Sequence, residues 1–294
     1  MNSVNSPVLK REVVQPKKNE KKRKVRFSLS MIGIGAMGTV VLGTIAVPLF
    51  APYNPNVNDL TQVLQPPSAA HWFGTDHLGR DIFTRVLYGG QKSLIIAIVV
   101  QLIAVVLGSL LGLLAGYFSG VVDKIIMAIT NIMFSFPGLL FAIAIMAALG
   151  PGIANLILAL ALVSWPEICR LVRAQTLSLK EREFVEGGYA LGASTFRILF
   201  RYILPNCYGN ITVIATLGMA STILAESSLS FLGLGVQPPD PSWGSMIDQG
   251  KDYMFNAPWF LFIPGAVMFI TILGINLLGD ALRDYFDPKM KSNK

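Results

Sequence analysis

The sequence is poor in charged residues and in cysteine. Only 14% of its 294 residues are charged, whereas 53% are hydrophobic, and the mean hydropathy is +0.56. Because a soluble domain has about a quarter of its residues charged, this composition excludes an ordinary soluble enzyme and a disordered protein. The two cysteines, Cys169 and Cys207, are too few and too far apart for a disulfide scaffold or a closed metal site.

The usual signatures of catalysis are missing as well. The G-x-x-x-x-G-K-S/T pattern of a phosphate-binding loop does not occur, so the chain cannot bind ATP in that way. Both histidines, His71 and His77, belong to one predicted loop, which leaves no nucleophile–His–acid set elsewhere. We expect no enzyme activity in this chain, no cofactor bound to it and no metal site.

The net charge of +7 is confined to the first 27 residues, which hold nine Lys or Arg and two acids. A basic tail beside an apolar segment is typical of a topology signal that also contacts anionic lipid. We predict that residues 1–27 form a cytoplasmic tail without a nucleic-acid partner. RNA binding by this tail is the alternative.

Six apolar stretches are long enough to cross a bilayer, which takes about 20 residues per helix. They are residues 28–50, residues 93–122, two spans within 125–166 separated at Gly150-Pro151-Gly152, residues 208–235, and residues 253–279. The sequence therefore predicts an all-α membrane protein with six transmembrane helices. Residues 28–50 form the first helix, and residues 93–285 form a five-helix core.

Lysine and arginine counts orient the predicted helices. With the tail inside, the inner segments contain 20 basic residues, and the outer segments contain only Arg80, Arg85, Lys92 and Lys251. Basic residues favour the cytoplasmic side. Both termini, including residues 286–294, are therefore expected in the cytoplasm, with an outer loop at 51–92 and a long inner loop at 176–206.

A glycine appears at every fourth position of the second span, at Gly108, Gly112, Gly116 and Gly120. Small residues at this spacing let two membrane helices approach closely. We expect a tightly packed neighbour, either within the chain or in a partner.

The long inner loop predicts a short polar helix after Arg182, a turn at Gly192 and a basic amphipathic stretch. Pro205 then starts the next span at a position that tolerates proline. A charged loop between nearly chargeless spans favours docking to a cytoplasmic partner by a helix-in-groove mode. An amphipathic loop lying on the lipid surface is the alternative.

Glu186, Gly192 and Leu204-Pro205 match the spacing of the signature loop of ABC importer permeases, so the chain resembles that family. The resemblance implies that this loop couples to an ATPase subunit. The residues implied are Glu183, Glu186, Gly187, Gly188, Gly192, Ala193, Leu204, Pro205 and Asn206. Gly187 and Gly188 stand where alanines are usual. Since glycine inside a helix costs about 1 kcal/mol, the helix is expected to form mainly on docking.

Three further stretches, residues 71–81, 225–235 and 276–284, extend the resemblance to the second permease subunit of dipeptide, oligopeptide and nickel importers. It implies a bacterial cell-membrane protein with a homologous second permease, one or two cytoplasmic ATPases that bind ATP and Mg, and an extracytoplasmic solute-binding protein. The implied substrate is a di- or oligopeptide. Nickel or a metal chelate is the alternative.

Three sets of polar residues are of interest for function. Glu226 is an acid well inside a predicted span, so it either lines the translocation path or is a hydrogen-bonded structural acid. Glu167, Arg170 and Arg173 share a helix face that either anchors an interface or takes part in gating. In the outer loop, Asp76, Arg80 and Asp81 are expected to contact a docked binding protein or the second permease, with metal ligation by the histidines as the alternative.

Two other functional classes compete with an importer permease. A self-sufficient secondary transporter often shows inverted repeats and several charges within its spans, whereas this sequence shows neither a clear repeat nor more than one deep acid. A membrane-embedded enzyme would need a catalytic constellation. ATP-independent transport in liposomes would favour the secondary transporter.

Overall fold

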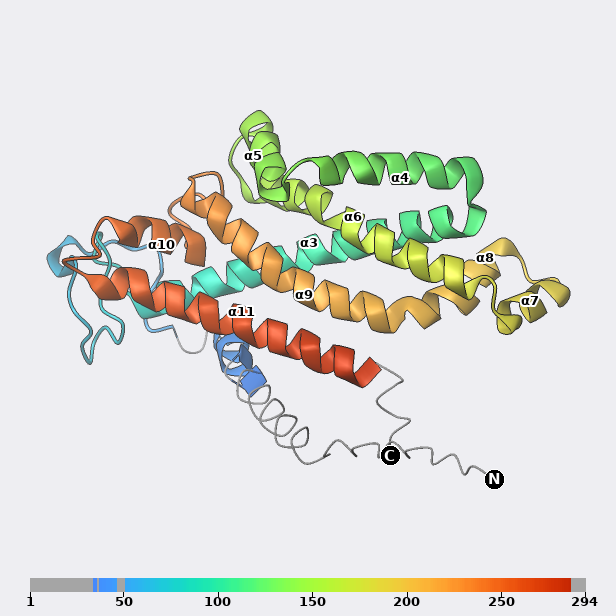
Figure 1. Cartoon of the computed structure of the whole chain (residues 1–294). Coiled ribbons are helices and arrows are strands. Elements are labelled where there is room, and N and C mark those ends of the chain that lie inside the picture. Colours follow the sequence, from blue (N-terminus) through green and yellow to red (C-terminus); the bar gives the residue numbers. More distant parts are fainter. Residues whose placement is uncertain (1–33, 36, 47–50, 287–294) are drawn as a thin grey trace, which may run out of the picture.

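The computed structural model describes residues 34–35, 37–46 and 51–286 (Figure 1). Residues 37–45 are helical, but about half of the first predicted span, namely residues 28–33, 36 and 47–50, and almost all of the two predicted tails lie outside the described residues. Within the described part the chain is almost entirely helical. The predicted all-α class is confirmed there.

Four long helical segments dominate the fold. They are α3 (Ile82–Phe118), α6 (Ile153–Leu179), α11 (Pro258–Phe286), and a continuous segment, Thr195–Phe231, that comprises α8 (Thr195–Arg197), the π-helix η2 (Ile198–Ile203) and α9 (Leu204–Phe231). The shorter elements are η1 (Leu60–Gln62), α4 (Gly120–Ser135), α5 (Gly138–Leu149), α7 (Glu183–Ala190) and α10 (Trp243–Lys251). The four long segments are apolar enough to cross a membrane.

The third predicted span is not one straight helix, which corrects the sequence analysis. α4 and α5 meet at a 91° bend, so the described residues hold four spans, or five when this pair counts as one. The break falls at Phe136-Pro137, where Phe136 has an extended backbone, because a proline disfavours helical backbone in the residue before it. The predicted break at Gly150–Gly152 is present as well, between α5 and α6.

The second span starts earlier than its charge-free stretch. α3 begins at Ile82 rather than at Ser93, and Asp81 caps it by accepting a hydrogen bond from the Thr84 amide at 2.7 Å. The helix continues through Arg85 and Lys92 because both charges have partners in the outer loops, namely Asp76 and Asp240. A charged residue therefore does not mark the end of this helix.

α3 packs closely against α6, and glycines allow the approach. A Cβ atom at Gly108 would lie 2.7 Å from the Trp165 carbonyl oxygen, and one at Gly112 would lie 2.6 Å from that of Cys169. Gly116 meets Thr176 in the same way. The tight neighbour is thus within the chain. Gly120 is an exception, since it follows the turn at Ser119, starts α4 with a φ of +57° and has no atom within 4 Å of its Cβ position.

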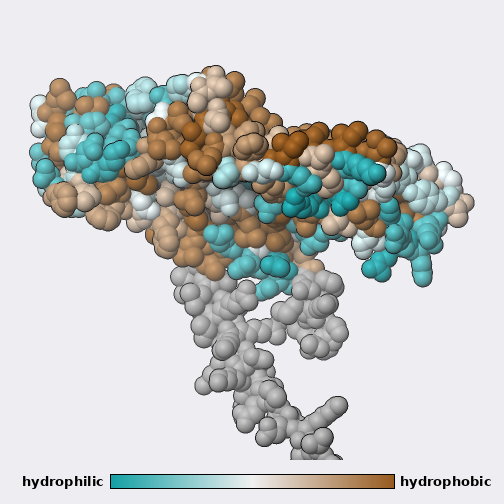
Figure 2. All heavy atoms as spheres, turned by 45° about the horizontal axis from the view of Figure 1, so that its top comes forward, coloured by the Kyte–Doolittle hydropathy of each residue, from teal (hydrophilic) through white to brown (hydrophobic). Residues whose placement is uncertain are grey.

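The loops lie at opposite ends of the molecule. Residues 51–81 and α10 gather at one end, whereas α7 and α8 lie at the other (Figure 1). Apolar residues cover most of the middle of the face drawn in Figure 2, and polar residues gather towards the two ends. This distribution suits a protein that crosses a bilayer with its loops in water on both sides.

Candidate functional site

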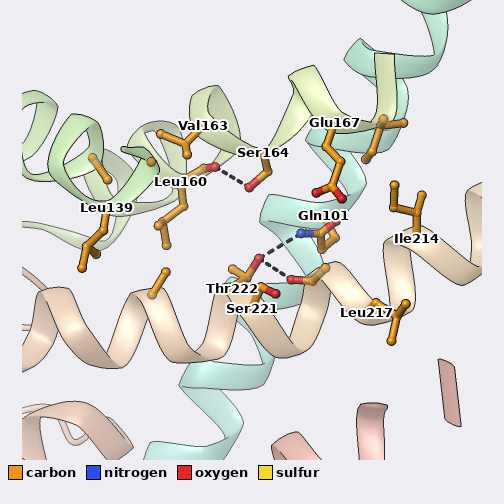
Figure 3. A pocket seen from close by; sticks show the side chains of 15 residues that line it. Gln101, Leu139, Leu160, Val163, Ser164, Glu167, Ile214, Leu217, Ser221 and Thr222 are labelled. Carbon is orange, nitrogen blue, oxygen red and sulfur yellow. Dashed lines mark hydrogen bonds between the residues drawn. The ribbon is translucent and has the colours of Figure 1, made fainter. Parts of the chain in front are cut away.

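A cavity of about 290 Å³ lies between α3, α5, α6 and α9, near the middle of the spans (Figure 3). Its walls are mostly apolar, with side chains such as Leu139 from α5 and Ile214 and Leu217 from α9. The polar side chains that line it are Gln101, Ser164, Glu167, Ser221 and Thr222. They come from three helices that are distant in the sequence.

Gln101 links α3 to α9 at the base of the cavity. Its side chain is 6% exposed, and its amide nitrogen donates to the Thr222 hydroxyl oxygen at 2.9 Å. Thr222 in turn donates to the Gly218 carbonyl oxygen at 2.8 Å. A Cβ atom at Gly218 would lie 2.7 Å from Gln101 Oε1, so glycine makes room for the amide. The contact holds a polar group at a fixed place in an apolar wall.

Glu167 lies in the middle of α6, exposed, and its carboxylate points into the cavity towards Gln101 (Figure 3). A charged side chain at the centre of a membrane helix costs roughly 2.5–3.5 kcal/mol, so such residues face a watery cavity or another helix rather than lipid. The open side of this cavity is therefore a surface that water or a partner covers.

The two arginines predicted to share a face with Glu167 are held by α4 instead. Arg173 forms a two-pronged ion pair with Asp123, and Arg170 donates to Asn131 Oδ1 at 3.1 Å while stacking 4.1 Å from the Phe134 ring centre. These contacts join α4 to α6. Of the three residues, Glu167 alone faces the cavity.

Glu226 does not line the cavity. It is fully buried, and it accepts hydrogen bonds from Ser230 at 2.7 Å, Ser93 at 3.0 Å and Ser227 at 3.4 Å. These contacts join α9 to α3. Because its oxygens are occupied by hydroxyl donors, the geometry favours the structural acid over the translocation path, and both roles stay predictions.

The inner loop forms α7 followed by a tight turn. Gly192 has a φ of +74°, its amide donates to the Tyr189 carbonyl at 2.9 Å, and the Ala193 amide donates to that of Gly188 at 3.0 Å. These two bonds define a Schellman motif, which needs a left-handed residue where glycine stands. The predicted helix and turn are both confirmed.

One side of α7 is buried and the other is open. Val185 and Gly188 face inwards, and a Cβ atom at Gly188 would lie 2.9 Å from Ile198. The open side of α7 carries Glu183, Phe184, Glu186 and Gly187, and two residues that follow the helix, Leu191 at 87% and Phe196 at 70%, are exposed as well. We call this set the inner patch.

The first turn of α9 contains Leu204, Pro205 and Asn206, and the position of the proline is as predicted. The chain is, however, already helical from Thr195 onwards. Proline has no amide hydrogen, and its ring clashes with the carbonyl four residues back. The preceding six residues form the wider π-helix η2, which accommodates this defect. Asn206 donates to the Tyr202 carbonyl at 2.6 Å.

The three predicted contact residues of the outer loop are buried within the chain, and their contact with a docked protein stays a prediction. Asp76 is fully buried and binds Arg80 Nε at 2.7 Å, while Arg85 Nε lies 3.4 Å away. Asp81 caps α3 and lies 2.9 Å from His71 Nδ1. Asp76, Arg80 and Asp81 thus make contacts that stabilise the loop itself.

Both histidines have structural contacts. His71 binds Asp81 with one ring nitrogen and Gln62 Oε1, at 2.7 Å, with the other. His77 stacks on Tyr253 and Phe260, with ring centres 5.7 Å apart in each case, and burial lowers the pKa of His77. Among the described residues, no three His, Cys, Asp or Glu side chains gather as a metal site would require.

Sequence reasoning did not assign the polar cavity residues to a site. Gln101 is the single strongly polar side chain in its apolar stretch, and this feature of the sequence could have identified it as a candidate site residue. Ser164, Ser221 and Thr222 give no such signal, because hydroxyl residues are common in membrane helices, where they bond to their own backbone.

Arg85 was also missed. It is 1% exposed and donates to the Pro55 carbonyl at 2.6 Å, which ties the outer loop to α3.

Comparisons with known proteins agree with this architecture. Residues 108–292 match the family described as binding-protein-dependent transport system inner membrane component. The chain is 45% identical over 271 residues to the glutathione transport system permease protein GsiD of Shigella dysenteriae serotype 1, covering 90% of this chain and 89% of that one. It is 43% identical over 272 residues to GsiD of Pectobacterium atrosepticum, covering 91% and 90%.

Two solved structures share the fold. A chain of the MetNI methionine ABC transporter, in an inward-facing conformation, aligns with a TM-score of 0.55 at 19% identity, covering 68% of this chain and 95% of that one. A chain of an amino acid ABC transporter aligns with a TM-score of 0.52 at 17% identity, covering 69% and 94%.

Proposed function

This chain belongs to the family of binding-protein-dependent transport system inner membrane components, and from that premise we propose how it acts within an importer. It is an ABC importer permease and a multi-pass bacterial membrane protein, not itself an enzyme. We propose that it forms one half of a translocation path, that a homologous permease forms the other half, and that partner ATPases bind and hydrolyse ATP with Mg.

The inner patch is the observation that carries the proposed ATPase contact. Exposed apolar side chains lie beside Glu183 and Glu186 on a short helix, at the end of the molecule opposite the outer loops (Figure 1). A helix with one buried and one open side suits docking into a groove. ATP binding in the partner would then move α7. Because Gly188 of α7 packs on Ile198 of η2, the movement would pass to η2 and along α9 to the cavity.

The cavity supports the proposed half path. It lies at mid-span, it opens to a surface, and its exposed carboxylate needs water or a polar partner. A second permease facing this side would close the path between the two chains. A solute-binding protein would deliver substrate at the end formed by residues 51–81 and α10.

We propose di- and oligopeptides as the substrates. The relatives are named as glutathione permeases, and glutathione is itself a peptide. Amides such as that of Gln101 and hydroxyls such as that of Ser221 suit the polar groups of a peptide backbone. Nickel would need soft or imidazole ligands along the path, and neither His71 nor His77 lines this cavity.

The test is co-purification in mild detergent of the chain expressed together with its neighbouring transport genes. Gly192→Val should lose the ATPases but keep the second permease, because a β-branched residue is strained at a φ of +74°. Gly192→Asn is the matched control and should keep both, since asparagine tolerates this conformation. A wild-type chain that purifies alone and moves peptide without ATP would overturn the proposal.

A further inference from the structure

Glu167 is the single ionisable side chain among the described residues that line the cavity. No described basic residue pairs with it, since Arg173 is paired with Asp123, while Arg170 keeps its positive charge but is bound by the neutral side chain of Asn131 and does not line the cavity. The carboxylate therefore gives the cavity a negative potential, and low-dielectric walls focus such a potential.

Two of the neutral hydroxyl groups of the cavity, those of Ser164 and Thr222, present acceptors rather than donors. Ser164 donates its proton to the Leu160 carbonyl at 2.7 Å, and Thr222 donates to that of Gly218. The amide nitrogen of Gln101 is engaged by Thr222, which leaves its carbonyl oxygen as the free end. Ser164 and Thr222 thus keep lone pairs while their protons are in use, whereas Gln101 keeps one N–H and Ser221 keeps its hydroxyl proton.

A primary ammonium group has three donors, a positive charge and no acceptor. It matches an unpaired carboxylate set among hydroxyl and amide oxygens, whereas a carboxylate or a phosphate does not. We infer that Glu167 is a specificity-determining residue of this permease, which attracts the protonated N-terminal amino group of a peptide into the cavity. The inference rests on the proposed peptide function and extends it to the feature of the substrate that is recognised.

The potential can be measured without transport. Ser221 is exposed on the cavity wall, and Cys169 and Cys207 are fully buried, so Ser221→Cys introduces one accessible thiol on the described part of the chain. The full complex in nanodiscs is treated with a cationic and an anionic methanethiosulfonate reagent of similar size. The ratio of their rates, corrected for their rates with a free thiol in water, reports the local potential.

We expect the cationic reagent to be favoured, and Glu167→Gln to lower the ratio about tenfold. Glu167→Asp should keep most of the ratio, since it keeps the charge. Asp252→Asn, the same carboxylate-to-amide change at the exposed end of α10, should leave the ratio unchanged. The inference is overturned if Glu167→Gln does not change the ratio, or if neither reagent reaches the thiol.

Uptake of tri-alanine by proteoliposomes containing the full complex tests recognition of the amino group. With native Ser221, Glu167→Gln should lower uptake about tenfold, and Glu167→Asp should keep most of it. Uptake that is unchanged in Glu167→Gln would overturn the role of the carboxylate in substrate selection. If the wild-type complex takes up no tri-alanine, the proposed peptide function fails, while the reagent ratio still tests the potential set by Glu167.

Discussion

Two acids in apolar surroundings have opposite environments in this molecule. Glu226 is enclosed by serine hydroxyls, whereas Glu167 points into an open cavity. Sequence analysis identified Glu226 as the deep acid and grouped Glu167 with two arginines. A local signal did exist, since Ser227 and Ser230 follow Glu226 on its own helix, but the third donor, Ser93, comes from α3. Long-range packing of this kind is not encoded in local spacing.

Glu226→Ala should destabilise the protein by roughly 2–4 kcal/mol, because it leaves a void and removes the acceptor from three buried hydroxyls. Glu226→Gln keeps a carbonyl acceptor and should cost much less. Thermal unfolding in detergent compares the two variants with wild type. If both variants unfold at the wild-type temperature but fail to transport, Glu226 belongs to the path after all.

His77 makes the outer end sensitive to pH. Its pKa is lowered mainly by burial, and Arg80 and Arg85 add to this effect while Asp76 opposes it. A histidine whose folded pKa lies below the unfolded value of 6.5 favours its neutral form in the native state. Its contribution to stability is therefore present above pH 6.5 and is lost as the pH falls through the folded pKa.

We accordingly expect faster hydrogen exchange in residues 71–81 at pH 5.5 than at pH 7.5, after correction for the chemical exchange rate. His77→Gln should remove most of this difference. Two carboxylates near this loop do not explain it, since Asp59 and Asp240 have pKa values below the usual aspartate range, held there by hydrogen bonds from Thr61 and Lys92 respectively. Exchange that stays equal at the two pH values would rule out a role for His77.

At the scale of elements, the glycine spacing correctly predicted a close helix pair but not its extent. Gly108, Gly112 and Gly116 lie against α6, whereas Gly120 starts another helix. A four-residue spacing continues in the sequence whether or not the helix does, and the turn at Ser119 ends it here. The bend between α4 and α5 was missed in the same way, because hydropathy measures apolar length and not direction.

Gly112→Ala tests the close contact between α3 and α6. The added methyl group would lie 2.6 Å from the Cys169 carbonyl oxygen, so the helices must separate, at a cost of about 1–3 kcal/mol. Gly265→Ala in α11 is the matched control, since no atom lies within 4 Å of its Cβ position and alanine favours a helix. Thermal unfolding should show a lower midpoint for Gly112→Ala alone. Equal midpoints would mean that the contact is looser than the structure shows.

At the scale of the whole molecule, the charge pattern predicts which loops share a side of the membrane. Residues 51–81 and α10 do gather at one end of the structure, away from α7 (Figure 1). The cavity was not predictable in this way, because α3, α5, α6 and α9 meet there through packing between distant segments. Charge asymmetry determines the side of a loop, whereas helix contacts depend on three-dimensional shape.

The orientation in the membrane remains a prediction, and two exposed side chains can test it. Phe255 lies after α10 and Leu191 follows α7, and each is 87% exposed. A membrane-impermeant maleimide applied to intact spheroplasts should label Phe255→Cys but not Leu191→Cys, and permeabilised membranes should label both. Cys169 and Cys207 are buried, so the unmodified chain is the background control. If Leu191→Cys alone were labelled in intact spheroplasts, the predicted topology would be wrong and its opposite would hold. The inner patch would then lie outside the cell, where it could not meet a cytoplasmic ATPase.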